Sequence, residues 1–220
     1  MRLKKIMEVS LMANRVEPPS EDWVPKTRLG MMVKQGLIFS YSDILKNNYV
    51  VKEPEIVKAL VPNLEYEVLE VRLVQKMTDS GRRTKFRALV VVGNRDGLIG
   101  VGIGKAKEVP SAINKAMNNA ILNIVPVKRG CGSWECGCGT NHSIAHVSKG
   151  SWGSVEVTLK PGPRGLGIVA GDTAKKVIEL AGVHDVWAIA FGETRTPISF
   201  AMAVYDALRN TYSLVYKTGE

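Results

Sequence analysis

Residues 65–76 alternate between hydrophobic and polar positions, and residues 84–92 place hydrophobic residues on one face while Lys85 and Arg87 point the other way, so both stretches predict β-strands. The hydrophobic positions are Leu69, Val71 and Leu73 in the first stretch and Phe86, Ala88, Val90 and Val92 in the second. Residues on one face of a strand recur at every second position, so each set should lie on one face. The turn sequence 94–97 then predicts a hairpin into a third strand over 98–105.

Hydrophobic residues at helical spacing mark one segment on either side of these strands. Residues 54–60 predict a short helix that ends before Pro62, and a longer helix should begin at Pro110. The apolar face of the longer helix comprises Ile113, Ala116, Met117, Ala120, Ile121 and Ile124. We expect hairpin and helix to cover each other's apolar sides, in the order helix, three strands, helix.

The third strand carries glycines at every second position, which invites comparison with phosphate-binding loops. The pattern G-x-x-x-x-G-K-[ST] would need Gly at 99 and Ser or Thr at 106, where the chain has Ile99 and Ala106. The pattern G-x-G-x-x-G, started at Gly100 or Gly102, meets a lysine in place of its last glycine. We interpret the glycines as a strand face without side chains, to which a protein or RNA backbone could come close.

The second half of the chain predicts the order strand, strand, helix, strand, helix. The predicted elements are a hairpin of strands 143–148 and 152–159 joined by Lys149-Gly150-Ser151, a helix that Asp172 caps and Gly182 follows, a strand over 186–191 and a helix from Pro197. The loop before Asp172 is too rich in Gly and Pro to be regular throughout.

The pattern predicts an α+β fold in four parts. These are an N-terminal extension (1–52), an α-β-β-β-α domain with the plan of double-stranded-RNA-binding modules (53–129), a Cys- and Gly-rich linker (130–142) and a β-β-α-β-α domain (143–220). The extension mixes charges with three prolines and predicts one or two short helices packed on another part of the molecule. Partial disorder of residues 1–20 is the alternative.

The charge is concentrated in the middle of the chain. The net charge is +9, and residues 1–65 hold 10 basic against 8 acidic side chains, 66–150 hold 13 against 6, and 151–220 hold 7 against 7. A concentrated basic excess favours a nucleic-acid partner, because each neutralised phosphate releases counterions. A generally basic soluble protein, the alternative, fits the two end segments only.

The basic residues that we expect to contact RNA are Lys76, Arg82, Arg83, Lys85, Arg87, Arg95, Lys105, Lys107, Lys128 and Arg129, with Lys160 and Arg164 as local contacts in the Pro-Gly loop. Phosphate contacts of this kind carry no base code and weaken steeply with salt. No apolar run approaches the length of a membrane span, and the first residues lack the pattern of a signal peptide, so we expect a cytosolic protein.

Cys131, Cys136, Cys138 and His142 have the spacing C-x4-C-x-C-x3-H. Three thiolates and an imidazole are a sufficient shell for a structural zinc ion, and the glycines between them let the chain wrap tightly. His146 is an alternative fourth ligand, and reduced cysteines without metal are an alternative to the site itself. Three cysteines in one short segment do not form the disulfide framework of a secreted domain.

Catalysis finds little support in the sequence. No serine lies in a G-x-S-x-G elbow, and His184 is expected to be a surface turn residue. Asp172 and Asp185 have explanations as cap and turn residues. Trp134 and Trp152 are expected to pack against the second domain, with stacking on bases as the alternative.

Two long motifs resemble the universal small-subunit ribosomal protein five family in its archaeal and eukaryotic form. The first reads V-V-V-G-N-R-D-G-L-I-G-V-G-I-G-K-A-K-E-V-P-S-A-I-N-K-A-M, and the second reads L-K-P-G-P-R-G-L-G-I-V-A-G-D-T-A-K-K-V-I-E-L-A-G-V-H-D-V-W. The insert C-G-S-W-E-C-G-C-G is similar to archaeal members. The resemblance covers roughly residues 20–215.

The resemblance implies a first domain that contacts small-subunit rRNA and a second, α/β sandwich domain with a left-handed β-α-β crossover. It implies a non-enzymatic, cytoplasmic protein that lines the mRNA entry channel, supports decoding accuracy and lies beside small-subunit proteins four and eight, without forming a homo-oligomer. The hairpin over 74–85 would reach toward the decoding region. A free-standing RNA-binding regulator and a small-molecule kinase are the alternatives from other classes.

Overall fold

The computed structural model describes residues 15–16, 23–61 and 63–217. The helices and strands are α2 (Arg28–Lys34), α3 (Tyr41–Lys46), α4 (Pro54–Leu60), β1 (Glu65–Thr78), β2 (Gly81–Gly93), β3 (Leu98–Ala106), α5 (Val109–Leu122), β4 (Val125–Pro126), β5 (Arg129–Gly130), β6 (Ser143–Ile144), β7 (Ser148–Trp152), β8 (Val155–Pro161), β9 (Ile168–Val169), α6 (Asp172–Leu180), β10 (Val186–Phe191) and α7 (Pro197–Lys217). The predicted α+β class is confirmed, and none of the described helices is long and apolar enough to span a membrane.

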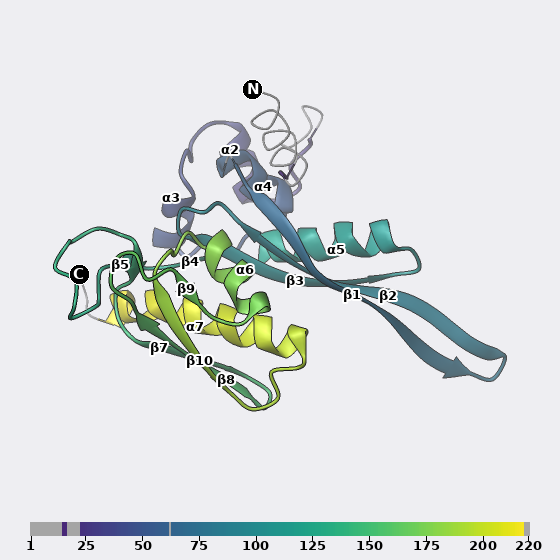
Figure 1. The fold of residues 1–220 in the computed structure, drawn as a ribbon. Helices are drawn as coiled ribbons and strands as arrows, with labels where there is room; N and C mark the ends of the chain where they lie inside the picture. The colour runs from purple at the N-terminus through teal and green to yellow at the C-terminus, as the bar shows by residue number, and fades with distance from the viewer. Residues whose placement is uncertain (1–14, 17–22, 62, 218–220) are drawn as a thin grey trace, which may run out of the picture.

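The first sheet contains β1, β2, β3 and β4 in that order, and all neighbouring strands are antiparallel. The hairpin of β1 and β2 stays paired as far as Thr78 and Gly81. Its outer half projects from the rest of the molecule, as Figure 1 shows. The first sheet therefore has a packed inner half and an exposed arm.

A β-bulge between Val68 and Glu70 interrupts the alternation of β1. Leu69 packs against the main core, whereas Val71 lies opposite Ala88, which belongs to the core under α5. The prediction that Leu69 shares a face with Val71 is therefore wrong. The reason is that a bulge adds one residue to one strand, so the side chains beyond it change faces.

Both faces of the inner half of β2 are buried. Ala88, Val90 and Val92 face α5, which confirms the predicted apolar face. Leu89 and Val91, on the opposite face, belong to the main core. The first sheet is thus covered on one side by α5 and on the other by the second half of the chain.

Helix α5 lies directly on the glycine face of β3 (Figure 1). A Cβ at Gly100, Gly102 or Gly104 would come within 2.4 Å of the α5 backbone, for instance 2.2 Å from the nitrogen of Ala120 at Gly102. The backbone that approaches this strand is therefore that of a protein helix, one of the two possibilities that the glycine pattern leaves open.

The second sheet has the order β7-β8-β10-β9, with β9 parallel to β10. Its hairpin turns at Gly153, with φ at 64°, and not at the predicted turn 149–151, which is part of β7. The strand needs Gly150, because a Cβ there would lie 2.1 Å from the nitrogen of Ala207 in α7. Strand β6, which we expected in this hairpin, pairs instead with β5.

Helix α6 begins at Asp172, and its N-cap is Gly171, so the prediction that Asp172 caps the helix is wrong. Asp172 is the first residue inside the helix, where a carboxylate favours the positive end of the helix dipole. Gly182 follows the helix with φ at 76°, as predicted. The two residues of β9 form a short strand within the predicted loop, and β9, α6 and β10 make a β-α-β unit.

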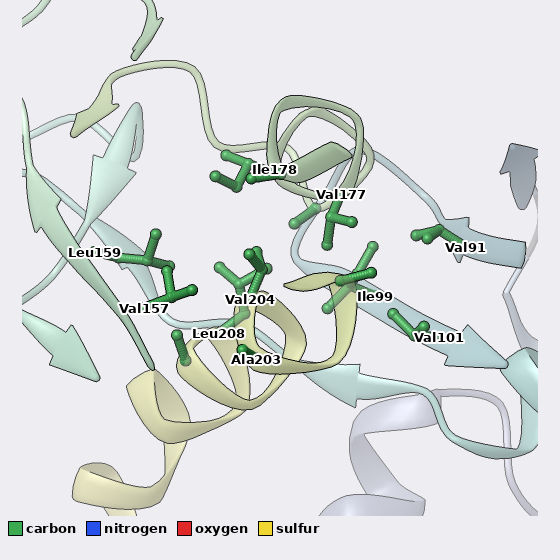
Figure 2. Close-up of a cluster of buried hydrophobic side chains, with 14 of the residues drawn as sticks. Val91, Ile99, Val101, Val157, Leu159, Val177, Ile178, Ala203, Val204 and Leu208 are labelled. Atoms are coloured by element: carbon green, nitrogen blue, oxygen red, sulfur yellow. The ribbon is translucent and has the colours of Figure 1, made fainter. Parts of the chain in front are cut away.

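Helices α6 and α7 lie between the two sheets (Figure 1). Figure 2 shows the main core that forms there from both halves of the chain. Its buried members include Val91 and Val101 of the first sheet, Val177 of α6, Val204 of α7 and Leu159 of β8. One shared core holds the halves together, and the four-part division of the chain remains a prediction.

Helices α2, α3 and α4 share a small core of their own, which confirms the predicted short helices packed on another part of the molecule. Its buried residues are Leu29, Ile38, Ile44 and Ile56. The carboxylate of Glu53 accepts the N–H groups of Lys26 and Thr27 at 2.9 and 2.7 Å, just before α2 begins. The expectation of disorder in residues 1–20 lies outside the described residues, except for 15 and 16.

Candidate nucleic-acid interface and metal centre

A row of cations crosses the first sheet. Arg72 of β1 lies directly opposite Arg87 of β2, and Arg87 lies directly opposite Lys105 of β3. Arg87 lies two positions before Leu89 on β2, so both side chains are on the same face of the sheet. Arg72 and Lys105 lie directly opposite Arg87 and therefore share this face. Arg72 forms an ion pair with Glu70 of the same strand, whereas Nε of Arg87 is buried without a hydrogen-bond partner among the described residues. Like charges placed directly opposite destabilise a sheet, so the facing pair of Arg87 and Lys105 favours an anion supplied by a partner.

The same face continues along the projecting hairpin. Lys85 lies two positions before Arg87, and Lys76 lies opposite Arg83. Arg82, near the hairpin tip, points to the other face. We call the following six residues the basic face: Arg72, Lys76, Arg83, Lys85, Arg87 and Lys105. The structure thus gathers five of the predicted RNA contacts on one surface and adds Arg72.

A hollow of about 440 Å³ adjoins the basic face at the start of α5. Its basic lining residues are Lys85, Lys105, Lys107 and Lys115. Sequence reasoning missed Lys115 and Arg72. Lys115 lies one helical turn after Ser111 on the polar side of α5, and Arg72 lies between apolar residues in β1. The sequence pattern could have indicated both residues, because each lies on the side of its element opposite the apolar face.

Arg95 and Arg129, two other predicted RNA contacts, hold carboxylates of the protein itself. Arg95 donates to Glu65 at 2.8 Å and to Glu179 of α6 at 3.1 Å. The hydrogen bond with Glu65 raises the pKa of Arg95 above its ordinary value. Arg129 forms an ion pair with Asp96. These two arginines therefore connect the hairpin turn 94–97 to its surroundings.

Three further predicted contacts lie away from the basic face. Lys128 is exposed between β4 and β5, and Lys160 is exposed on β8, opposite Trp187. Arg164 is exposed in the loop 162–167 between β8 and β9. None of these three residues is paired with a residue of the basic face in the described sheets.

The predicted metal ligands converge in the loop between β5 and β6. One ligand atom from each of Cys131, Cys136, Cys138 and His142 lies within 4.8 Å of the other three. The sulfur of Cys136 is 3.9 Å from Nε2 of His142. A tetrahedral zinc with bonds of about 2.0–2.3 Å places its ligand atoms about 3.5–3.8 Å apart. A contraction of about 1 Å would close this shell, so the residues fit the metal.

A buried carboxylate orients the imidazole of His142. Its Nδ1 is 2.8 Å from Oδ2 of Asp185, and both residues are buried. With the proton of the neutral imidazole on Nδ1, between these two atoms, Nε2 keeps its lone pair, which is available to a metal on the side of the cysteine sulfurs. Burial alone would raise the pKa of Asp185, but hydrogen bonds from Gly167 and His142 outweigh it and hold the pKa below its ordinary value.

Asp185 contacts a predicted metal ligand, and sequence reasoning missed it because it treated the residue as part of a turn. The carboxylate and His142 are 43 positions apart, and no local pattern connects them. His146, the alternative fourth ligand, is not part of the cluster. Its Nε2 is buried without a hydrogen-bond partner among the described residues.

The side chain of Trp134 is 91% exposed, so the expectation that it packs against the second half of the chain is wrong. Trp152 is 49% exposed at the end of β7. His184 is exposed after α6, as predicted for a turn residue. Stacking of the two tryptophans on bases remains a prediction.

Two family models match the chain: ribosomal protein S5, N-terminal domain, over residues 64–128, and ribosomal protein S5, C-terminal domain, over residues 150–217. Among curated relatives, proteins named small ribosomal subunit protein uS5 are similar over most of the chain. That of Pyrobaculum arsenaticum is 57% identical over 190 residues, covering 86% of this chain and 94% of the relative. That of Ignicoccus hospitalis is 57% identical over 196 residues, covering 89% and 93%. That of Methanocaldococcus jannaschii is 58% identical over 190 residues, covering 86% and 88%. Both halves of the chain, with the basic arm and the core that joins them, therefore belong to the ribosomal protein S5 family.

Proposed function

We propose that this protein is a structural, non-enzymatic constituent of the small ribosomal subunit in the cytoplasm and that its basic face binds small-subunit rRNA. The observation that carries the proposal is the row of Arg72, Arg87 and Lys105 in direct register across three strands. Such a row costs stability in the free protein and is neutralised when phosphates lie over it. Relatives named small ribosomal subunit proteins support the same conclusion.

Removing the charges of this row should affect the stability of the protein and its RNA binding differently. We expect the triple variant Arg72→Ala, Arg87→Ala, Lys105→Ala to melt at the same or a higher temperature than the wild type. Repulsion across the sheet is removed, and the Arg72–Glu70 ion pair that is lost with it lies near the surface, where such pairs contribute little. Binding to a small-subunit rRNA fragment should weaken, and the slope of log K against log salt should fall by about 2–3, roughly 0.7–0.9 for each lost phosphate contact. Filter binding between about 50 and 200 mM salt measures this slope.

The matched control is Arg195→Ala, which removes one exposed cation from the charge-balanced second half. Its rRNA affinity and salt slope should match those of the wild type. The same affinity and slope in the triple variant and the wild type would show that RNA does not lie on the basic face. The double variant Arg82→Ala, Arg83→Ala tests the predicted contacts at the hairpin tip in the same assay.

The projecting arm is the segment that we propose to lie at the mRNA entry channel and to support decoding accuracy. Its tip, residues 77–82, is largely exposed and carries Arg82. Shortening the arm by removing residues 77–82 and closing the hairpin with Asn-Gly should leave the core intact, because the buried part of the sheet begins beyond Phe86. Ribosomes with this variant should misread more codons in a reporter assay, and unchanged accuracy would contradict the proposal.

The second half of the chain is proposed to contact neighbouring small-subunit proteins, among them proteins four and eight. Its basic and acidic residues are balanced, 7 against 7, so it has no general electrostatic preference for RNA. In assembled subunits, crosslinks from residues 151–220 should reach protein partners. A map in which these residues reach only rRNA would contradict this assignment.

We propose a structural zinc ion as the occupant of the Cys/His cluster. Residues 130–142 are rich in glycine, and such a segment stays ordered only if something fixes it. Four protein ligands would complete the metal shell and leave no open position for catalysis. Elemental analysis of purified protein should find one zinc per chain, and less than about 0.2 would refute the site. Cys136→Ser should release the metal and leave rRNA binding by the basic face largely intact.

A further inference from the structure

The carboxylate of Asp185 serves two parts of the molecule at once. Its Oδ2 lies 2.8 Å from His142 Nδ1 in the Cys/His cluster. Its Oδ1 accepts the N–H of Gly165 at 3.1 Å and the N–H of Gly167 at 2.8 Å. Both oxygens of one buried side chain therefore connect the proposed metal centre to the loop 162–167.

Backbone hydrogen bonds tie the same three segments together. The carbonyl of His142 accepts the N–H groups of His184 and Asp185 at 2.9 and 3.2 Å. The hydroxyl of Ser143 donates to the carbonyl of Asp185 and accepts the N–H of Gly162 at 3.2 Å. These contacts align the segments, but only the Asp185 carboxylate joins the imidazole to the loop.

Packing alone does not determine the conformation of this loop. Gly165 and Gly167 have φ of 90° and 77°, and a Cβ at either would meet nothing within 4 Å. Glycines in open space have many accessible conformations. The two hydrogen bonds to Asp185 select one of them together with two backbone bonds, from the N–H of Val186 to the carbonyl of Gly167 at 3.2 Å and from the N–H of Leu166 to the carbonyl of Pro163 at 3.3 Å. Arg164, immediately before Gly165, takes its position from this selection.

We infer that Asp185 is a positioning residue that couples metal binding at His142 to the conformation of the loop that presents Arg164. The inference rests on the proposed zinc site. With Nε2 of His142 bound to a metal, the imidazole would be held in place, and its Nδ1–H would hold the carboxylate of Asp185, which accepts the N–H groups of Gly165 and Gly167. Coupling between two sites is reciprocal, so a loop held in place also strengthens metal binding.

The variant Asp185→Asn distinguishes a residue that orients His142 from one that only supports the loop 162–167. The asparagine oxygen can still accept from Gly165 and Gly167, but its NH2 group then faces His142 Nδ1. An NH2 group opposite Nδ1 favours the imidazole tautomer with its proton on Nε2, which blocks the metal. A residue that only supported the loop would tolerate this change. Ser143→Ala is the matched control, because it removes two neighbouring buried hydrogen bonds, to Asp185 and from Gly162, and leaves the contact between Asp185 and His142.

The test uses the full-length chain with Zn²⁺ in competition with a chromophoric chelator, together with amide hydrogen exchange in residues 162–167. We expect Zn²⁺ to slow exchange in the wild-type loop at least several-fold. Asp185→Asn should weaken zinc affinity by about 10–100-fold and abolish the zinc-dependent protection, whereas Ser143→Ala should change affinity by less than about threefold. With Co²⁺, the same variant should lose intensity in the sulfur-to-cobalt bands.

Wild-type affinity in Asp185→Asn, or exchange in the wild-type loop that Zn²⁺ does not alter, would overturn the coupling. The second measurement requires no variant, so it decides the question even if Asp185→Asn fails to fold. A wild-type chain that takes up no zinc overturns the metal site as well. A wild-type chain that binds zinc while its loop exchanges unchanged refutes the coupling alone.

Discussion

Gly102→Ala tests the contact between α5 and β3, the strand that carries Lys105 of the basic face. A Cβ at this position would lie 2.2 Å from the nitrogen of Ala120 and 2.3 Å from the carbonyl oxygen of Ala116. Ordinary contacts of a Cβ begin near 3.4 Å, so the helix would have to move by about 1 Å, the difference between 3.4 and 2.2. Both opposing atoms belong to the backbone, and no side-chain rotation can relieve the overlap.

A shift of this size disturbs the contacts that hold the helix on the strand. Asn119 Nδ2 donates to the carbonyl of Ile103 at 2.8 Å, and Asn123 Nδ2 donates to that of Val101 at 3.3 Å. Overpacking costs about 1–3 kcal/mol, and each weakened hydrogen bond adds up to about 1 kcal/mol. We therefore expect a loss of about 3–4 kcal/mol in the free energy of unfolding, or a fall in Tm of roughly 6–16 °C for a chain of this size.

Thermal unfolding of the metal-free chain, followed by circular dichroism, measures the change, and Gly137→Ala, in the loop between Cys136 and Cys138 and away from the contact of α5 with β3, is the control. A Cβ at Gly137 would meet nothing within 4 Å. Its Tm should stay within about 2 °C of the wild type, or rise slightly because alanine restricts the unfolded chain. If Gly102→Ala melts within the same 2 °C, α5 does not lie against β3 at the distance described, and the reasoning from the glycine pattern fails.

Two further predictions concern charged contacts. The hydrogen bonds to Glu53 at the start of α2 outweigh its burial and hold its pKa below 4.5, so its contribution to stability is complete above that pH and is lost as pH falls through the folded-state pKa. Glu53→Gln should lower the free energy of unfolding by about 1–2 kcal/mol at pH 7, and this difference should disappear as pH falls through the folded-state pKa of Glu53; a pH-independent difference would contradict this. A double-mutant cycle of Arg95 and Glu179 should give a coupling of about 0.5 kcal/mol that fades with salt, because the pair is exposed; no coupling at low salt would show that this pair does not tie the turn to α6.

The sequence by itself determined the features that depend on neighbouring positions. The alternation in β2, the helical spacing of α5 and the glycine series of β3 each predict an element and the face that it buries. The Cys/His spacing predicts a cluster because its four ligands lie within twelve residues, too close together for the fold to separate them widely. Local steric preferences and the period of each element suffice for these inferences.

Only the tertiary structure decided which contacts join distant parts of the chain. Leu89 and Val91 share a strand face with Lys85 and Arg87 but are buried, because the second half of the chain covers this part of the sheet. The pairing of β6 with β5 and the contact of Asp185 with His142 likewise join segments that no local period connects. A strand pattern states that one face is apolar, but the choice of partner depends on global packing and on where buried polar groups find hydrogen bonds. For this reason five of the six residues of the basic face could be named from the sequence, whereas their like-charged register and the residue that orients His142 could not.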